Sequence, residues 1–182
     1  MTASATIRRA TFDDVQGIHT LTQSAYAEYR TLIPYSSIWQ ETPQEIASEL
    51  ELGSIFLAEI EAKPVGSVRC YRQTTLEIER CCDRPFCDRP FLYIHRLAVL
   101  PSCRRLGLGR LLMQTVEAEA QSQHLSTLCL EVRTAQPENQ EFYTHLGYHL
   151  GAISRRFSDG SPRAYWMTKE IHPLTPTPPA ID

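Results

Sequence analysis

The segment at residues 104–109, Arg-Arg-Leu-Gly-Leu-Gly, most constrains what this chain of 182 residues can fold into. It follows the apolar run 92–100 and precedes an amphipathic pattern that predicts a helix over 107–122. Two glycines at such a junction let the backbone approach a ligand without intervening side chains. The amides of the first helical turn then face an anion, and the helix dipole and the arginines add attraction. The segment therefore predicts a turn that binds a pyrophosphate.

The overall composition excludes several classes of partner. The net charge is −3 and the pI is about 6.1, so no basic face indicates nucleic acid as a partner. No apolar stretch is long enough for a membrane span, and no signal peptide pattern precedes Ile7. The six cysteines have spacings that fit no common metal-ligand pattern. We therefore expect a reduced, cytoplasmic protein with no metal, no membrane and no nucleic acid.

Hydrophobic periodicity and turn signals define the order of elements. Strands are predicted over 6–10, 54–61, 65–71, 91–99, 125–132, 148–157 and 163–171. Helices are predicted over 12–29, 43–52, 107–122 and 137–147. The order β-α-α-β-β-β-α-β-α-β-β predicts one α/β (α+β) domain, with a mixed sheet of about seven strands and about four flanking helices.

Local signals mark the ends of several elements. Thr11 with Asp14 is typical of a capping box, and Thr42-Pro43 is typical of a helix start. Tight turns are predicted at Lys63-Pro64 and at residues 159–160, Asp-Gly. Residues 73–90 carry charges, prolines and cysteines without periodicity, which predicts a loop. The folded domain is expected to span residues 1–171, followed by a proline-rich flexible tail over 172–182.

Two motifs together resemble one enzyme superfamily. The first is residues 97–109, Leu-Ala-Val-Leu-Pro-Ser-Cys-Arg-Arg-Leu-Gly-Leu-Gly. The second is residues 130–133, Leu-Glu-Val-Arg, followed by residues 142–148, Phe-Tyr-Thr-His-Leu-Gly-Tyr. This arrangement resembles the GNAT superfamily of N-acetyltransferases over nearly the whole chain to about Ile171, and the second motif is similar to the ribosomal-protein alanine N-acetyltransferases. The resemblance implies an enzyme that transfers an acetyl group from acetyl-coenzyme A to a primary amine.

The resemblance also implies where the co-substrate acetyl-coenzyme A binds. The pyrophosphate is expected on the amides of residues 105–110, and the pantetheine arm is expected along strand 91–99, where a bulge opens a cleft. Gln136 takes the place of an asparagine that often contacts the pantetheine in this superfamily. The implied coenzyme-binding residues are Leu97, Ala98, Val99, Arg104, Arg105, Leu106, Gly107, Leu108, Gly109, Arg110, Gln136, Asn139 and Tyr143.

The reaction needs a proton donor, and Tyr143 is the candidate. The coenzyme leaves as a thiolate, which is better expelled when it receives a proton. A tyrosine phenol has a reference pKa of about 10, so it stays protonated at neutral pH and can donate. The matching tyrosine has this role in many members of the superfamily. The alternative is a tyrosine that only packs against the coenzyme.

The reaction also needs a base, because an alkylammonium has a reference pKa of about 10. Glu131 matches a glutamate proposed as base in the ribosomal-protein relatives, and its alternative is an ion pair with Arg133 or Arg96. Tyr93 stands where other members carry a glutamate base. His95 shares the face of Tyr93 on a regular strand and titrates near neutrality, so it is the second candidate. The alternative for His95 is a partly buried histidine with satisfied partners.

The acceptor is a small amine or a peptide N-terminus whose identity the sequence leaves open. Its pocket is expected between helix 12–29, the aromatic loop 33–39 and the C-terminal strand hairpin. Tyr26, Tyr29, Tyr35 and Trp39 are either pocket walls or core. The competing function is a non-catalytic module that binds acyl-coenzyme A. A monomer and a homodimer are both compatible with the sequence.

Overall fold

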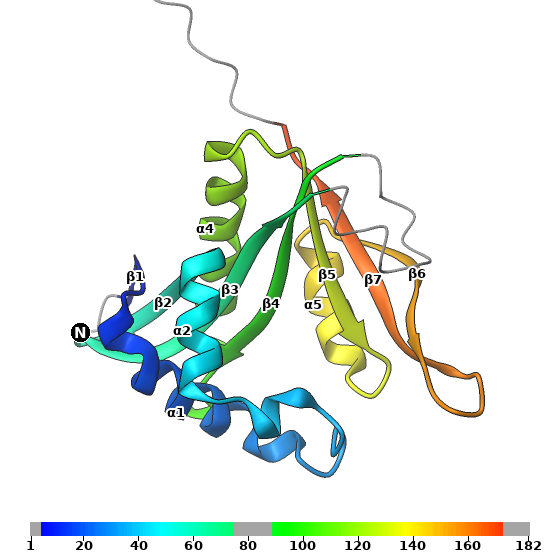
Figure 1. The fold of residues 1–182 in the computed structure, drawn as a ribbon, viewed down its shortest axis with the longest axis horizontal. Helices are drawn as coiled ribbons and strands as arrows, with labels where there is room; N and C mark the ends of the chain where they lie inside the picture. The colour runs from blue at the N-terminus through cyan, green and yellow to red at the C-terminus, as the bar shows by residue number, and fades with distance from the viewer. Residues whose placement is uncertain (1–4, 75–88, 173–182) are drawn as a thin grey trace, which may run out of the picture.

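The computed structural model describes residues 5–74 and 89–172 as one layered α/β domain (Figure 1). Its strands are β1 Ala5–Arg9, β2 Ser54–Ile60, β3 Lys63–Gln73, β4 Phe91–Val99, β5 Thr127–Arg133, β6 His149–Arg156 and β7 Pro162–Glu170. Its α-helices are α1 Val15–Tyr26, α2 Pro43–Leu52, α4 Leu108–Ser122 and α5 Pro137–His145. Short 3-10 helices flank α1 and lie before α2 and after β4. The predicted order of elements is confirmed.

The strands form one mixed sheet in the order β1-β2-β3-β4-β5-β7-β6. The pairing of β4 with β5 is parallel, and the other five pairings are antiparallel. The predicted mixed sheet of seven strands is therefore confirmed. Because β4 and β5 are parallel, their carboxyl ends lie at the same edge of the sheet, and the segments that follow both strands meet there.

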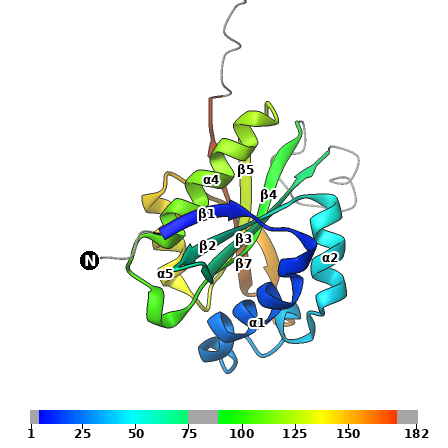
Figure 2. The same ribbon diagram turned by 90° about the vertical axis from the view of Figure 1, so that its left-hand side faces the viewer.

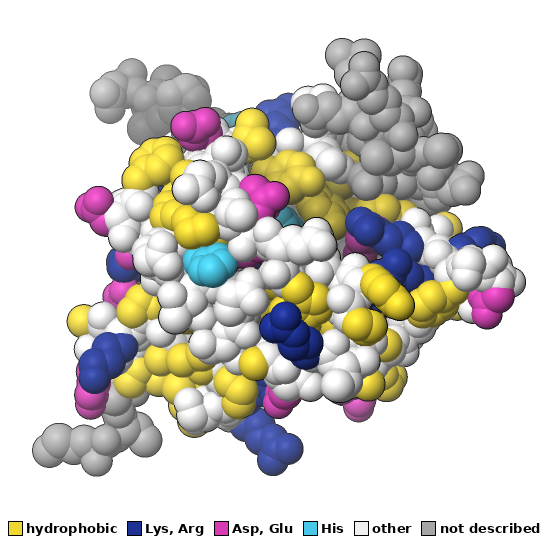
Figure 3. All heavy atoms as spheres, turned by 60° about the horizontal axis from the view of Figure 1, so that its bottom comes forward, with side chains coloured by type: hydrophobic (Ala, Val, Ile, Leu, Met, Phe, Trp, Pro, Cys, Tyr) yellow, Lys and Arg dark blue, Asp and Glu magenta, His cyan; other side chains and the backbone are white. Residues whose placement is uncertain are grey.

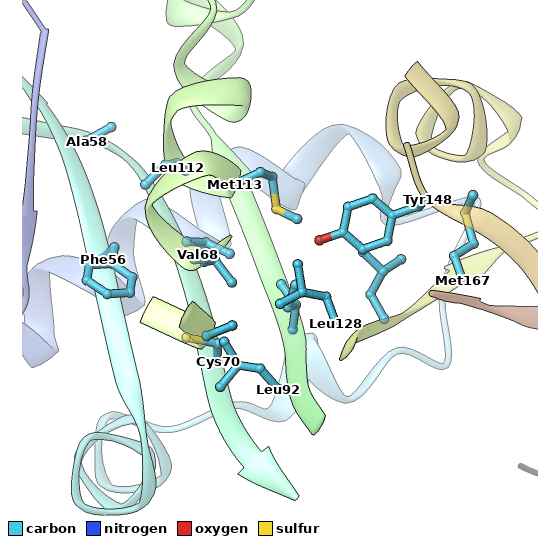
Figure 4. Packing of buried hydrophobic residues seen from close by; sticks show 14 of the residues in the cluster. Phe56, Ala58, Val68, Cys70, Leu92, Leu112, Met113, Leu128, Tyr148 and Met167 are labelled. Carbon is cyan, nitrogen blue, oxygen red and sulfur yellow. The ribbon is translucent and has the colours of Figure 1, made fainter. Parts of the chain in front are cut away.

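The sheet is covered on both faces (Figures 1 and 2). Side chains alternate between the faces of a strand, so in β2 Phe56 and Ala58 join one core while Ile55 and Leu57 join another. The larger core lies under α4 and α5 and contains Leu112 (Figure 4). The smaller core lies under α1 and α2. Helices α4 and α1 therefore reach the open edge of β4 from opposite faces of the sheet.

The sheet opens where β4 and β5 part. Their pairing extends only from Leu92–Leu128 to Ile94–Leu130, and Figure 1 shows the two strands diverging beyond it. On the other side of β4 the pairing slips between Ser67–Ala98 and Arg69–His95, so β4 holds one extra residue there. Arg96 lies in this bulge with a φ of 54°. A bulge increases the local twist of a strand, which carries the end of β4 away from β5.

Three details of the prediction are wrong. The turn between β2 and β3 lies at Glu61-Ala62, both with positive φ, and Pro64 is inside β3. A two-residue turn in which both residues have positive φ matches the right-handed twist of the paired strands. The chain therefore turns at Glu61-Ala62, before it reaches Pro64. The apolar spacing in 107–122 predicts that Leu111 shares a buried face with Leu108 and Leu112, but Leu111 is 39% exposed and Met113 is buried instead. The predicted helix 12–29 consists of α1 with a 3-10 turn at each end.

The predicted helix starts and the last hairpin are confirmed. The Asp14 carboxylate accepts from the Thr11 backbone N–H at 2.8 Å, and the Glu45 carboxylate accepts from that of Thr42 at 2.7 Å. The β6–β7 connection turns at Gly160, with a φ of 84°. The loop predicted over 73–90 falls mostly, and the tail over 172–182 almost wholly, outside the described residues. Within the described ranges, no helix combines the length and apolarity needed to cross a bilayer.

Candidate active site

A cleft of about 480 Å³ opens at the carboxyl end of β4, and we call it the outer cleft. It lies between the end of β4, the turn that starts α4, and α5. Most of the residues predicted to bind the coenzyme line it, with Leu106 and Tyr143 as the exceptions. Its walls are Ala25, Tyr26, Tyr29, Leu97, Ala98, Val99, Cys103, Arg104, Arg105, Gly107, Leu108, Gly109, Arg110, Gln136, Asn139 and Phe142.

The turn at residues 104–109 has the backbone form that its sequence predicts. Arg105 and Gly107 both have positive φ, 62° and 78°. Gly107 is the N-cap of α4, so the first N–H groups of that helix have no acceptor within the helix. Gly109 serves packing, because a Cβ there would lie 3.2 Å from the Phe142 ring. The turn therefore presents amides and a helix N-terminus to the outer cleft, an arrangement suited to phosphate oxygens.

Arg104 is held by the protein itself. Its guanidinium pairs with Glu28 and donates to the carbonyl of Ala25 at 3.0 Å, while its Nε donates to the carbonyl of Val99 at 3.3 Å. The guanidinium also lies over the ring of Tyr29, 5.6 Å from the centroid. The side chain therefore joins α1 to the end of β4 at the wall of the cleft. Arg105 and Arg110 are exposed at the same wall.

The end of β4 offers backbone groups to the cleft. The N–H of Leu100 donates to Val65 of β3 at 2.9 Å. Because successive residues of a strand point their backbone groups to opposite sides, those of Leu97 and Val99 point away from β3, toward the gap. The carbonyl of Leu97 accepts from the hydroxyl of Tyr26 at 3.0 Å. An extended amide chain lying in the gap can therefore add to the exposed edge of β4 as a strand would.

A second cavity, of about 110 Å³, continues from the outer cleft between β4 and β5, and we call it the inner cavity. The two share Tyr26, Leu97, Gln136 and Asn139 as walls. The three predicted catalytic residues all line the inner cavity. Its remaining walls are Ser36, Tyr93, Ile94, Arg96, Leu130, Val132, Arg133, Arg155 and Ala164. Groups bound in the two spaces can therefore meet at the shared wall.

Tyr143 reaches the inner cavity from α5. Its ring packs edge-on against Phe142 and Tyr148, with centroids 5.1 and 5.7 Å away. Burial raises the pKa of the Tyr143 phenol well above its usual range. The hydroxyl is therefore protonated at every physiological pH and available as a donor.

His95 lies on β4, stacked on the ring of Tyr93 with a centroid distance of 5.7 Å. Its Nε2 is buried without a hydrogen-bond partner among the described residues and lies 3.9 Å from the Glu49 Oε1. Burial, and then the charges of Arg69 and Arg96, lower the pKa of His95 well below its usual value. The imidazole is therefore neutral at pH 7, and the same burial and positive charges make it a weaker base than a histidine in water.

Glu131 points from β5 into the same cavity and is paired with Arg155 of β6 at 3.3 Å. The ion-pair alternative is therefore present, but the partner is Arg155 and neither Arg133 nor Arg96. The Glu131 side chain is 16% exposed, whereas that of Arg155 is 60% exposed. Because Arg155 is largely exposed to solvent, its ion pair with Glu131 is only weakly stabilising. The Glu131 carboxylate can therefore exchange partners when a ligand enters.

Sequence reasoning missed a buried ionic cluster behind β4. Arg69, 1% exposed, donates to both carboxylate oxygens of Glu41 at 2.9 and 2.8 Å and to Glu49 at 2.8 Å. Arg96 of the bulge donates to Glu41 at 2.9 Å as well. The cluster ties the bulge to the segment before α2. A single charged residue in the otherwise uncharged run 65–71 was the signal that could have revealed it.

The four aromatic residues expected around the acceptor lie in different places in the structure. Tyr26 lines both cavities, and Tyr29 lines the outer cleft alone. Tyr35 is 85% exposed, and the Trp39 indole donates to the carbonyl of Ile33 at 2.8 Å. Only Tyr26 of the four therefore reaches the inner cavity. Cys70 and Cys103 are free thiols, and within the described ranges no group of His, Cys, Asp or Glu could hold a metal ion.

Solved acetyltransferase structures share this fold. The ribosomal-protein-S18-alanine N-acetyltransferase of Escherichia coli superposes with a TM-score of 0.68 at 20% identity, covering 92% of this chain and 94% of that one. An agmatine N-acetyltransferase gives a TM-score of 0.73 at 15% identity over 92% and 99% of the two chains. The PaiA N-acetyltransferase of Thermoplasma acidophilum, solved with coenzyme A, gives 0.67 at 14% identity over 92% and 99%. No curated protein sequence matched this chain.

The family follows from the sequence match. The sequence profile of the acetyltransferase (GNAT) family matches residues 18–148, which include most of α1, the glycine turn and all of α5. This is well over half of the chain, and the observed strand order and the opening between β4 and β5 agree with it. The chain belongs to the acetyltransferase (GNAT) family of acyltransferases.

Proposed function

We propose that this protein is an acetyl-coenzyme A-dependent N-acetyltransferase that acts on the primary amine of a small molecule or a peptide N-terminus. One observation carries the proposal. The outer cleft, with its glycine turn and exposed strand edge, runs into the inner cavity, where Tyr143, Glu131 and His95 collect. A donor bound in the first space and an amine bound in the second would meet at the shared wall.

The chain supplies the groups that direct transfer require. The ammonium first loses one proton to a base in the site. The amine nitrogen then forms a bond to the acetyl carbonyl carbon and the carbon–sulfur bond breaks. A second proton leaves the nitrogen and replaces the one that the sulfur takes from its donor. Tyr143 donates the proton to sulfur, since its phenol remains protonated. The proton from the amine goes to Glu131 or to the neutral His95, and both face the cavity.

The first experiment is an acceptor screen with acetyl-coenzyme A, followed by thiol release and by mass spectrometry of the product. Small amines, amino acids, aminoglycosides and peptide N-termini form the panel. Tyr143→Phe should lower kcat by about a hundredfold or more, because positioned proton transfer contributes at least that much. Coenzyme binding should be nearly unchanged. Tyr165→Phe, the same change at a β7 position outside both cavities, is the control.

Two further variants separate the candidate bases. The two variants are Glu131→Gln and His95→Gln. The variant that lacks the true base can no longer deprotonate the bound ammonium, so it reacts only with amine that is already neutral in solution. The rate of that variant should rise about tenfold per pH unit toward the amine pKa of about 10. The other variant should keep the wild-type profile. Tight binding of acetyl-coenzyme A without transfer to any acceptor would refute the proposed activity and favour the binding module.

A further inference from the structure

The inner cavity carries more positive charge than its own carboxylate balances. Three arginines line it, Arg96, Arg133 and Arg155, against one carboxylate, Glu131. Arg96 is paired with Glu41 behind the cavity, and Arg155 is paired with Glu131. His95 is neutral and adds no charge. Of the three arginines, Arg133 is therefore the one that is paired with neither Glu41 nor Glu131.

Arg133 has no acidic partner among the described residues. Its Nη2 donates to the hydroxyl of Ser36 at 3.1 Å, a neutral group. Partial burial lowers the pKa of Arg133, and the positive charges of neighbouring arginines, Arg163 first, lower it further, while the negative charge of Glu131 opposes this only in part. A half-buried guanidinium among like charges is an unfavourable arrangement, which an anion would relieve. Figure 3 shows Lys and Arg side chains gathered between a hollow in this face and the β6–β7 hairpin.

Arg133 also lies at the junction of two spaces. It lines the inner cavity and a smaller pocket of about 40 Å³ that opens beside Tyr35, Phe157 and Arg163. An acceptor that enters between the loop before α2 and the β6–β7 hairpin therefore passes this guanidinium before it reaches Tyr143. The fork of an arginine matches a carboxylate or a phosphate with two parallel hydrogen bonds.

Glu131 and Arg133 are spaced to bind the two ends of one molecule. They are two residues apart on β5, so they share a face, and both line the inner cavity. Leu130 and Val132 point into the core on the opposite face. Two residues along a strand place the two side-chain origins about 7 Å apart. A carboxylate and a guanidinium at that spacing complement an amine and an anion on the same ligand.

The geometry points to an acceptor that is an amine bearing a carboxylate or a phosphate, with its anionic group held by Arg133 and its amine near Glu131. This inference rests on the proposed acetyltransferase function and names the class of its acceptor. Amines with a second positive charge are expected to be poor acceptors, since they would meet Arg133 and Arg155.

Matched acceptor pairs test the inference in the wild-type enzyme. We compare kcat/KM for 5-aminopentanoate and its amide, for 2-aminoethyl phosphate and 2-aminoethanol, and for 1,4-diaminobutane. Each anionic member should exceed its neutral partner by roughly 10- to 100-fold, the range for hydrogen bonds to a charged group. The better of the two anionic members identifies carboxylate or phosphate as the group bound. Equal values, or a preference for the amide, the alcohol or the diamine, would overturn the inference.

Substitution of Arg133 tests whether this residue causes the preference for anionic acceptors. In Arg133→Gln the ratio of kcat/KM for the anionic acceptor to that for its neutral partner should fall toward one. A thermal unfolding midpoint and a circular dichroism spectrum that match the wild type would exclude misfolding. Arg156→Gln is the control, because Arg156 is an exposed β6 residue that donates to the carbonyl of Gly160 at 2.8 Å and lines neither cavity. A preference that survives Arg133→Gln would refute the assignment.

A binding measurement keeps this inference separate from the proposed activity. Calorimetry of 5-aminopentanoate and 2-aminoethyl phosphate with the protein saturated in coenzyme A needs no turnover. If no acceptor is acetylated, the proposed function fails. Binding that is lost in Arg133→Gln would then still support the anion site, and absence of binding in the wild type would overturn it.

Discussion

Replacing Glu41 with glutamine should destabilise the protein strongly, because it removes one charge from a buried pair. The Glu41 side chain is 5% exposed and Arg69 is 1% exposed, and two hydrogen bonds of 2.9 and 2.8 Å join them. Breaking a buried pair from one side costs about 3–5 kcal/mol, since the remaining charge is left without compensation. Arg69 keeps Glu49 at 2.8 Å, so we expect the lower end, about 3 kcal/mol.

Thermal and urea unfolding measure this change. For a chain of this length, 1 kcal/mol shifts Tm by about 2–4 °C, so Glu41→Gln should lower Tm by about 6–12 °C. Glu49→Gln is the matched control at the same arginine. Glu49 makes one hydrogen bond to Arg69 and its side chain is 29% exposed, so its loss should cost less than about 1 kcal/mol. A loss from Glu49→Gln that equals or exceeds that from Glu41→Gln would refute the reasoning.

The pH dependence of stability provides a second readout. Burial alone would raise the pKa of Glu41, but hydrogen bonds from Arg69 and the charges of Arg69 and Arg96 outweigh it and lower the pKa. The folded state therefore binds fewer protons than the unfolded state at acidic pH. The contribution of Glu41 is fully present above the unfolded pKa of about 4.5 and is lost as the pH falls through the folded pKa. In Glu41→Gln this part of the acid destabilisation should disappear.

The same substitution should reach the active site through Arg96. The Arg96 Nε donates to Glu41 at 2.9 Å, and Arg96 lies in the β4 bulge with a φ of 54°. A non-glycine residue in this conformation is maintained by its surroundings. Glu41→Gln should therefore raise the KM for acetyl-coenzyme A by several fold, and Glu49→Gln should leave it unchanged. An unchanged KM in both variants would show that the bulge does not depend on Glu41.

Three further predictions concern single positions. Gly109→Val should lower the free energy of unfolding in urea by about 1–3 kcal/mol, since even a Cβ at this position would lie 3.2 Å from the Phe142 ring. Gly17→Ala in α1 should raise it by about 0.5–1 kcal/mol, because no atom lies within 4 Å of the added Cβ. The opposite order of stabilities would contradict the packing. Tyr26→Phe removes the hydrogen bond to Leu97 and should cost about 1 kcal/mol, and a variant as stable as the wild type would show that this bond contributes nothing. The pKa of His95 is lowered, so the folded state binds fewer protons than the unfolded state and stability should fall as the pH drops below about 6.5; in His95→Gln this dependence should vanish, and its persistence would implicate another group.

Local patterns accounted for most of the elements. The capping residues Thr11 and Thr42 act on their own first helical turn, so their signals do not depend on distant residues. Strand β4 matches its predicted bounds, Phe91–Val99, because every residue of this largely apolar run is buried or partly buried. The two glycines after β4 predicted a turn at the start of a helix, and Gly107 forms it with a φ of 78°, since backbone freedom belongs to the residue type.

Turn chemistry was less reliable where two signals compete. Pro64 suggested a turn, yet the chain reverses at Glu61-Ala62, because the pairing of β2 with β3 places Ile60 opposite Lys63. The twist of that pair requires positive φ at two residues that carry no glycine signal. Arg96 shows the same limit, since its positive φ depends on the bulge and on contacts with Glu41 and Ser37.

The sequence by itself determined the glycine turn at 104–109, the candidate tyrosine and glutamate, and the order of strands and helices along the chain. These features depend on residue types and on the spacing between residues close together in the sequence. Only the tertiary structure decided that β4 and β5 part beyond Ile94 and that Arg69 is buried between two glutamates. It also decided that Arg133 lines the inner cavity with no acidic partner in the described part of the chain. Pairing and charge compensation join residues far apart in the chain, and their free energies depend on burial, which exists only once the sheet and its two layers of helices have assembled.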